Sequence, residues 1–175
     1  MTSRVERRRS GGRGCAESAT LGRSPSLATI VRAYVARHRS KAQEELAGFA
    51  KEPTVDSAVR RAGLAQRPCG RRFDHQRRLP RAVLEAAAAE LSRARLDDAP
   101  DFDVLQRRVK AAIGSISGIG ELTVYDTALR VGAKLGLLPT RVYLHSGTRD
   151  GARALGLNWR AESLAVMECR PSFVR

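Results

Sequence analysis

The sequence predicts an all-α fold, a small bundle of helices preceded by a disordered basic arm. Apolar residues recur at helical spacing through most of the chain, and no stretch keeps the alternation typical of a half-buried strand. Aromatic residues are few, with one Trp, three Tyr and four Phe among 175 residues. The core must therefore be built from Leu, Ile, Val and Ala, which suits packed helices. The length suits one domain.

The chain divides by composition into three parts. Residues 1–26 are rich in Gly, Ser and Arg and lack apolar periodicity, which predicts a disordered basic arm. Residues 27–157 are expected to form a single helical domain. The stretch 158–175 shows no clear period, and the sequence leaves open whether it is a final helix or a tail.

Local signals place the helices within the domain. Ser26, Thr54 and Asp101 are suitable N-caps, and prolines and glycines mark the breaks between helices. The expected helices are 27–51, 55–64, 81–95, 102–116, 122–135, a short one at 140–145, and one that is capped by Ser146 or Thr148 and runs through Ala154. Residues 67–81 hold six arginines and one aspartate between prolines, and they are expected to be a loop. No strand is expected.

The charge is strongly basic and unevenly distributed. The net charge is +14, of which residues 1–26 carry +4, residues 27–81 carry +8 and residues 82–175 carry +2. An uncompensated basic surface attracts phosphates by releasing condensed counterions, so we expect a polyanionic partner. A GC-rich genome would explain why arginine replaces lysine, but it would not explain the shortage of acids.

The remaining composition argues against several other classes. The three cysteines are scattered without a C-x-x-C pair, so neither a disulfide framework nor a zinc or iron–sulfur site is expected. The chain shows no secretory signal and no apolar run of about 20 residues, the length a membrane helix needs. We expect a cytoplasmic protein without a membrane partner.

The strongest local signal is the turn Gly118-Ile119-Gly120 between two amphipathic helices. Two glycines let the backbone bend sharply, and Ile119 can point inward and fix the bend. The following helix begins immediately, so its unpaired N–H groups and its dipole favour an anion there. These features predict a phosphate site made of main-chain amides, with Thr123 beside it. The alternative is an ordinary pair of helices joined by a glycine turn.

This stretch resembles the helix-hairpin-helix family, whose hairpin has a hydrophobic residue, a spacer and then Gly-hydrophobic-Gly. Here these are Ile116, Ser117 and residues 118–120, and the resemblance places the motif at 101–136. It implies sequence-independent binding of the DNA backbone, most readily of duplex DNA, by the glycine amides. It also implies a monovalent cation as a cofactor, held by the carbonyls of Ser117, Gly118 and Gly120.

The resemblance extends over residues 101–157 to the helix-hairpin-helix DNA glycosylases. The segment Val142-Tyr143-Leu144-His145, followed by Arg149, Arg153 and Leu155-Gly156-Leu157, is similar to theirs. Two catalytic positions differ, because Tyr143 stands where the glycosylases have Asp and Leu122 where bifunctional members have Lys. A phenol is neutral near pH 7 and cannot supply that negative charge. We therefore expect no catalytic residue.

Further candidate contacts lie outside the hairpin. Arg71, Arg72, Arg77 and Arg78, interleaved with Phe73, His75 and Gln76, suggest a surface that follows a nucleic-acid backbone. The alternative is a solvated loop that balances acids elsewhere. His145 and Arg149 are candidate phosphate contacts, although a lone histidine is more often a structural hydrogen-bonding residue. Tyr125 and Tyr143 could stack on a base, but packing in the core is the more common role.

The function that the sequence predicts is non-enzymatic, sequence-independent DNA binding. Two alternatives stay open. One is a divergent glycosylase or nuclease whose carboxylate comes from an unexpected position. The other is an interaction module of a larger DNA-processing complex. The sequence does not separate DNA from RNA or duplex from single strand.

Overall fold

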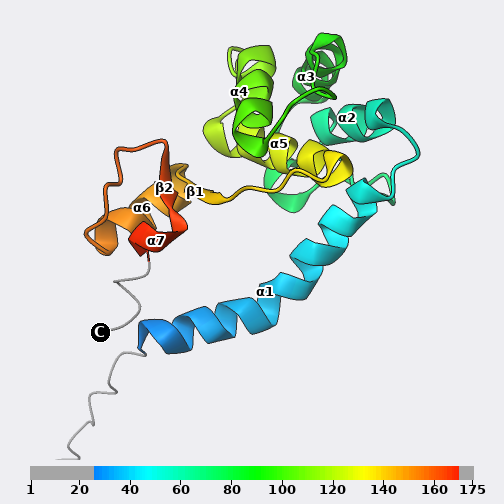
Figure 1. Ribbon diagram of the computed structural model, residues 1–175. Helices are drawn as coiled ribbons and strands as arrows, with labels where there is room; N and C mark the ends of the chain where they lie inside the picture. Colours follow the sequence, from blue (N-terminus) through cyan, green and yellow to red (C-terminus); the bar gives the residue numbers. More distant parts are fainter. Residues whose placement is uncertain (1–25, 170–175) are drawn as a thin grey trace, which may run out of the picture.

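The computed structural model describes residues 26–169, which form seven α-helices, a 3-10 helix and a two-stranded sheet (Figure 1). The expected arm therefore lies outside the described residues, apart from Ser26. The elements are α1 (Leu27–Ala50), α2 (Val55–Gly63), η1 (Asp74–Gln76), α3 (Arg81–Arg93), α4 (Phe102–Ile113), α5 (Glu121–Leu135), β1 (Arg141–Tyr143), α6 (Ser146–Ala154), β2 (Ser163–Ala165) and α7 (Val166–Cys169). The predicted helical fold is confirmed, with the small sheet as an exception.

Three of the predicted N-caps are confirmed. The prediction of Ser146 or Thr148 as the cap of α6 was wrong, because the cap is His145 and Thr148 lies in the first turn, where its hydroxyl accepts the His145 amide at 2.7 Å. The Ser26 side chain accepts the Thr29 amide, and Asp101 accepts the Val104 amide at 2.7 Å. Thr54 accepts the Ser57 amide while the Ser57 hydroxyl accepts the amide of Thr54. Each contact satisfies a donor that the helix itself leaves unpaired. Local chemistry thus explains why these helices start where they do.

Helix α5 is central to the larger part of the fold, because it packs against α1, α2 and α4 (Figure 1). Its residues Val124, Ala128 and Val131 are buried in one core with the apolar faces of the other helices. Helices α2 and α3 also meet closely. A Cβ on Gly63 would lie 2.6 Å from the Ala88 Cα, so only glycine permits this contact.

The segment expected as a helix at 140–145 is instead strand β1, and the expectation of no strands was wrong. Strand β1 pairs antiparallel with β2, with Val142 opposite Leu164. Three-residue strands are too short to show an alternating pattern, and the partner lies beyond α6. Residues from Asn158 to Cys169, left undecided by the sequence, pack around a second apolar cluster centred on Leu144, Ala152 and Leu164. We call β1, α6, β2 and α7 the C-terminal unit.

The arginine-rich stretch 67–81 is anchored to α5 rather than forming a solvated loop. Phe73 is 1% exposed and Gln76 is 2% exposed. The Arg130 guanidinium donates to Gln76 Oε1 at 2.8 Å and stacks 3.7 Å from the centroid of the Phe73 ring. Burial lowers the pKa of Arg130 to about 10, although nearby Asp126 opposes this shift, so the group stays charged at neutral pH.

The interpretation of Phe73 and Gln76 as surface residues was therefore wrong. Phe73 packs in the core beside Phe49, with 6.3 Å between the ring centroids, and cannot stack on a base. Of the three interleaved residues, only His75 is exposed, and its Nε2 lies 2.5 Å from Asp126 Oδ2. The stretch is held against the core through Phe73 and Gln76, and only some of its arginines are exposed.

We predict that Arg130→Ala destabilises the fold by about 3 kcal/mol, because it leaves Gln76 and Asp126 without their buried cation. Chemical denaturation measures this free energy of unfolding. The control Arg93→Ala removes an exposed pair with Glu90 and should cost less than about 0.5 kcal/mol. Equal losses in the two variants would contradict a structural role for Arg130.

Candidate nucleic-acid interface

The bend between α4 and α5 has the geometry that its glycines predict. Gly118 has a φ of +93°, in the left-handed region that favours glycine. The Ile119 amide donates to the Ile116 carbonyl at 2.9 Å, and the Ile119 side chain is buried in the core. Helix α4 ends at Ile113, earlier than expected, and α5 begins at Glu121. The predicted turn is thus confirmed.

The bend leaves main-chain donors open. Among the described residues, no hydrogen bond uses the amides of Gly118, Gly120, Glu121 or Leu122, and Gly120 provides no capping side chain. These N–H groups surround the start of a 15-residue helix, where the dipole favours negative charge. The interface therefore has donors suited to an anionic oxygen without any basic side chain.

Space around the bend allows an approach from outside. At Gly120, no neighbouring atom lies within 4 Å of the position that a Cβ would take. At Gly118, the nearest such atoms are Leu79 Cδ2 and Val83 Cγ1, both at 3.9 Å. Gly120 is thus the open side of the bend, and the end of the arginine-rich stretch borders the other side.

The arginine-rich stretch comes beside the hairpin only at its end, through Leu79. Arg77 and Arg78 are exposed and directly precede Leu79, which lies beside Gly118. Arg71 is exposed, but no described contact joins it to the hairpin. Arg72 is bonded within the protein, because its Nη1 donates to the Leu79 carbonyl at 2.8 Å. Arg72 thereby holds the loop that carries Arg77 and Arg78.

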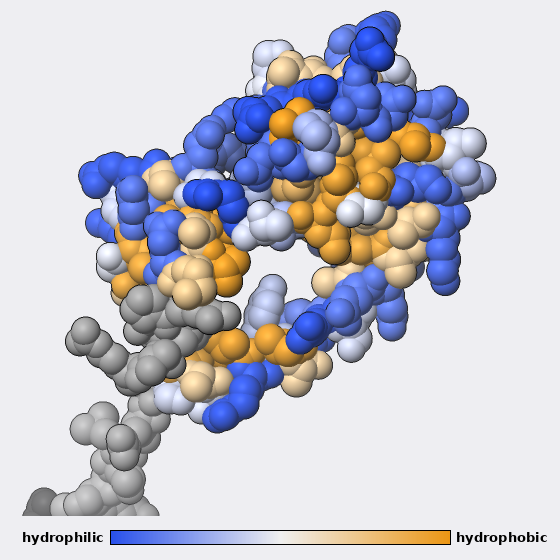
Figure 2. Space-filling model, in the orientation of Figure 1, coloured by the Kyte–Doolittle hydropathy of each residue, from blue (hydrophilic) through white to orange (hydrophobic). Residues whose placement is uncertain are grey.

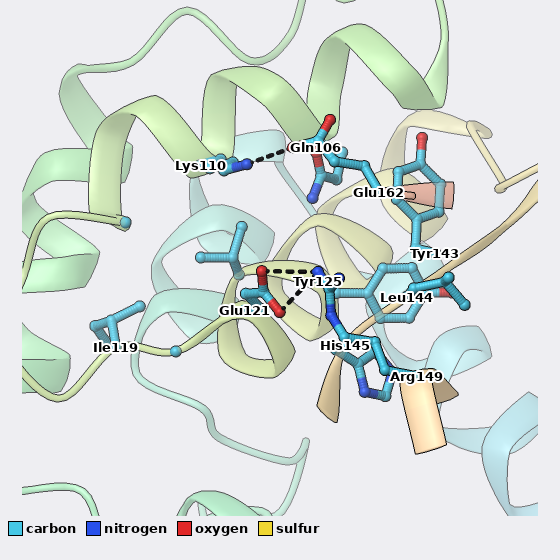
Figure 3. Close-up of a pocket in the computed structure, with 13 residues that line it drawn as sticks. Gln106, Lys110, Ile119, Glu121, Tyr125, Tyr143, Leu144, His145, Arg149 and Glu162 are labelled. Atoms are coloured by element: carbon cyan, nitrogen blue, oxygen red, sulfur yellow. Dashed lines mark hydrogen bonds and ion pairs between the residues drawn. The ribbon is translucent and has the colours of Figure 1, made fainter. Parts of the chain in front are cut away.

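A pocket of about 260 Å³ lies between the hairpin and the C-terminal unit (Figure 3). Two ion pairs line it. Arg149 Nη2 lies 3.0 Å from Glu121 Oε1, and Lys110 Nζ lies 2.6 Å from Glu162 Oε1. The hydrogen bond from Lys110 lowers the pKa of Glu162. Figure 3 shows both pairs beside the aromatic wall formed by Tyr125 and Tyr143.

The aromatic wall is part of the packing. Phe102, Tyr125 and Tyr143 form a cluster, with 5.6 Å between the two tyrosine ring centroids. The Tyr143 hydroxyl donates to Asp103, and burial together with this bond raises the pKa of Tyr143 well above its usual range. The packing role of both tyrosines therefore agrees with the structure, and Tyr143 is a neutral donor.

His145 and Arg149 lie on the pocket rather than on an open surface. The His145 ring stands 5.8 Å from the Tyr125 ring, and its Nδ1 is buried without a partner among the described residues. Arg149, predicted to contact phosphate, forms an ion pair with the Glu121 carboxylate at the start of α5. Sequence reasoning missed Lys110 and Glu162, because their pairing joins segments that are far apart in the chain.

Thr123 is half-buried in the first turn of α5, and no hydrogen bond among the described residues uses its amide. In the described part of the chain, no group of three or more His, Cys, Asp or Glu side chains could hold a metal ion.

Across residues 26–169, none of the helices combines the length and apolar character needed to cross a membrane.

No family model, curated protein or solved structure matches this chain. The chemistry of the hairpin and the pocket is thus the guide to its function.

The two glycines should respond differently to substitution. We predict that Gly118→Ala costs about 1–2 kcal/mol, because a Cβ strains the positive φ. Gly120→Thr should change stability by less than about 0.5 kcal/mol, because φ is −102° and threonine is a good N-cap. Thermal and chemical unfolding measure both. A larger loss at position 120 than at 118 would contradict this description of the bend.

Proposed function

We propose that the chain binds the sugar–phosphate backbone of duplex DNA, without sequence preference, through the bend at residues 118–120. Two observations support this: the amides at the start of α5 have no hydrogen-bond partner among the described residues, and no neighbouring atom occupies the space at the Gly120 Cβ position. Amide contacts to phosphate position a protein on DNA without reading bases. Arg77 and Arg78, beside the bend, extend the contact to neighbouring phosphates.

The proposal includes a monovalent cation at the bend. Carbonyl oxygens are suitable ligands for such an ion, and those of Ser117 and Gly118 accept no hydrogen bond among the described residues. The Gly120 carbonyl already accepts the Val124 amide at 3.1 Å, so only its second lone pair is free. The donor set fits a loosely held cation shared with a phosphate oxygen.

The proposal assigns no catalytic step to the pocket. Its two carboxylates, Glu121 and Glu162, are both held by cations. Tyr143 is bonded to Asp103 and has a raised pKa, so it supplies no negative charge. These contacts favour binding over the glycosylase or nuclease alternative.

We predict that Gly120→Thr weakens DNA binding by at least about tenfold, because its side chain caps the amides that would meet the phosphate. Fluorescence anisotropy with a labelled duplex measures the affinity. Gly151→Thr is the matched control, since Gly151 is exposed on α6 and also has no neighbouring atom within 4 Å of its Cβ position. Its affinity should stay within about twofold of the wild type.

Removing charge should act differently from capping the amides. Salt dependence is measured as the slope of the logarithm of the binding constant against the logarithm of the salt concentration. In the double variant Arg77→Gln/Arg78→Gln this slope should become shallower by about 0.9 for each phosphate that the variant no longer neutralises. Gly120→Thr should weaken binding with a much smaller change in that slope. If Gly120→Thr binds as tightly as the wild type, the hairpin is structural only and the proposal fails.

The Glu121–Arg149 pair should control how well the bend accepts an anion. Without Arg149, the Glu121 carboxylate can compete for the α5 amides, so Arg149→Gln should weaken binding by about two- to fivefold. Glu121→Gln should strengthen it by a similar factor. The same anisotropy titration applies to each variant.

The double variant separates this role of Arg149 from a direct phosphate contact. If Arg149 acts by holding Glu121, then Arg149→Gln has little effect in the Glu121→Gln background. If Arg149 touches the phosphate, the reduction in affinity is the same in both backgrounds. The second result would restore Arg149 as a DNA contact and contradict the positioning role.

A further inference from the structure

The first two thirds of α1 have no partner among the described residues. Residues 28–44 are all exposed, and only the last turns of the helix pack on the body of the fold (Figure 1). The free part nevertheless carries large apolar side chains. Ile30 is 51% exposed, Val31 36%, Tyr34 66% and Val35 39%. We call these four residues the α1 stripe.

The α1 stripe continues the face by which the same helix docks on its own core. Val35 and Phe49 are about four helical turns apart, so they project to the same side. Phe49 is fully buried, and Glu45 is held by Arg67 at 2.6 Å. Figure 2 shows apolar atoms along α1 on the side that borders a hollow between this helix and the rest of the molecule. The four residues of the stripe are thus neighbours on the surface of α1, beside the side that docks on the core, and not scattered exposed residues.

Basic side chains accompany the stripe without internal compensation. Arg32, Arg37, Arg39 and Lys41 are exposed, and no ion pair among the described residues includes any of them. A helical segment that packs against nothing is only marginally stable in water. An apolar stripe with positive borders therefore favours a partner that is apolar at its centre and acidic at its edges.

We propose that the α1 stripe docks an acidic amphipathic helix of another protein. Such a helix supplies apolar side chains for the stripe and carboxylates for the four cations, and it fits a hollow bordered by a helix. A second copy of α1 would place like charges together. A DNA duplex offers phosphates for the cations but no continuous apolar surface for the stripe, and a flat bilayer does not fit the hollow beside α1.

The proposal does not depend on DNA binding by the hairpin. The stripe lies on α1, whereas the proposed phosphate contact lies at the start of α5. A variant at Gly120 should therefore bind the acidic helix normally, and a variant of the stripe should keep its DNA affinity. Failure of one proposal is thus distinguishable from failure of the other.

The test uses the full chain and a labelled synthetic helical peptide with leucines at positions i, i+3, i+4 and i+7 and glutamates on both borders. The expected result is saturable binding that weakens at least about tenfold in Ile30→Ser/Tyr34→Ser. The control Ala33→Ser/Ala36→Ser changes exposed positions off the stripe and should bind within about twofold of the wild type. Circular dichroism checks that every variant is folded.

Charge and occupant are tested in the same assay. Replacing Arg32, Arg37, Arg39 and Lys41 by Gln should weaken binding, and so should a peptide with lysine in place of glutamate. A scrambled peptide of the same composition should not bind. Failure of the acidic helix to bind, or equal binding of the scrambled peptide, overturns the proposal.

Two further measurements decide between occupants. Stripe-dependent binding to vesicles that contain anionic lipid, without binding of the acidic peptide, would assign the stripe to a membrane surface instead. A dimer in sedimentation velocity that Ile30→Ser/Tyr34→Ser dissociates would assign it to a second copy of the chain. Either result contradicts the proposed partner.

Discussion

The left-handed backbone at Gly118 is the constraint on which the rest of the interface depends. It allows Ile119 to turn into the core and lets α5 begin directly after the bend. Because Gly120 has no side chain, the first amides of α5 stay uncapped. The same helix then packs against α1, α2 and α4, so the direction of those amides is fixed by the main core. The proposed DNA contact is thus a consequence of how the core is assembled.

A buried cation links the second part of the interface to the same helix. Arg130 of α5 bonds Gln76 and stacks on Phe73, and this holds the arginine-rich stretch against the core. Arg72 then fixes the end of the stretch through the Leu79 carbonyl. The exposed Arg77 and Arg78 directly precede Leu79, whose side chain lies beside Gly118, and these buried contacts hold that part of the stretch in place. Charge beside the bend therefore depends on side chains that never face a ligand.

The sequence predicted what local chemistry determines. The caps at Ser26, Thr54 and Asp101 and the turn at 118–120 were confirmed, because each depends on neighbouring residues. It did not predict what depends on distant partners. Strand β1 needs β2, the pocket needs Lys110 and Glu162, and Phe73 is buried only because α5 covers it. A run of arginines likewise does not show which of them are already bonded, as Arg67 and Arg72 are.

The central claim is that main-chain amides at the bend meet phosphate oxygens. The most direct measurement is a ¹H–¹⁵N correlation spectrum of the labelled chain, recorded while a duplex oligonucleotide is added. The account predicts that the amide signals of Gly118, Gly120, Glu121 and Leu122 shift most, with proton shifts downfield as each N–H gains an anionic acceptor. Saturable binding that moves signals elsewhere and leaves these four unchanged would contradict it.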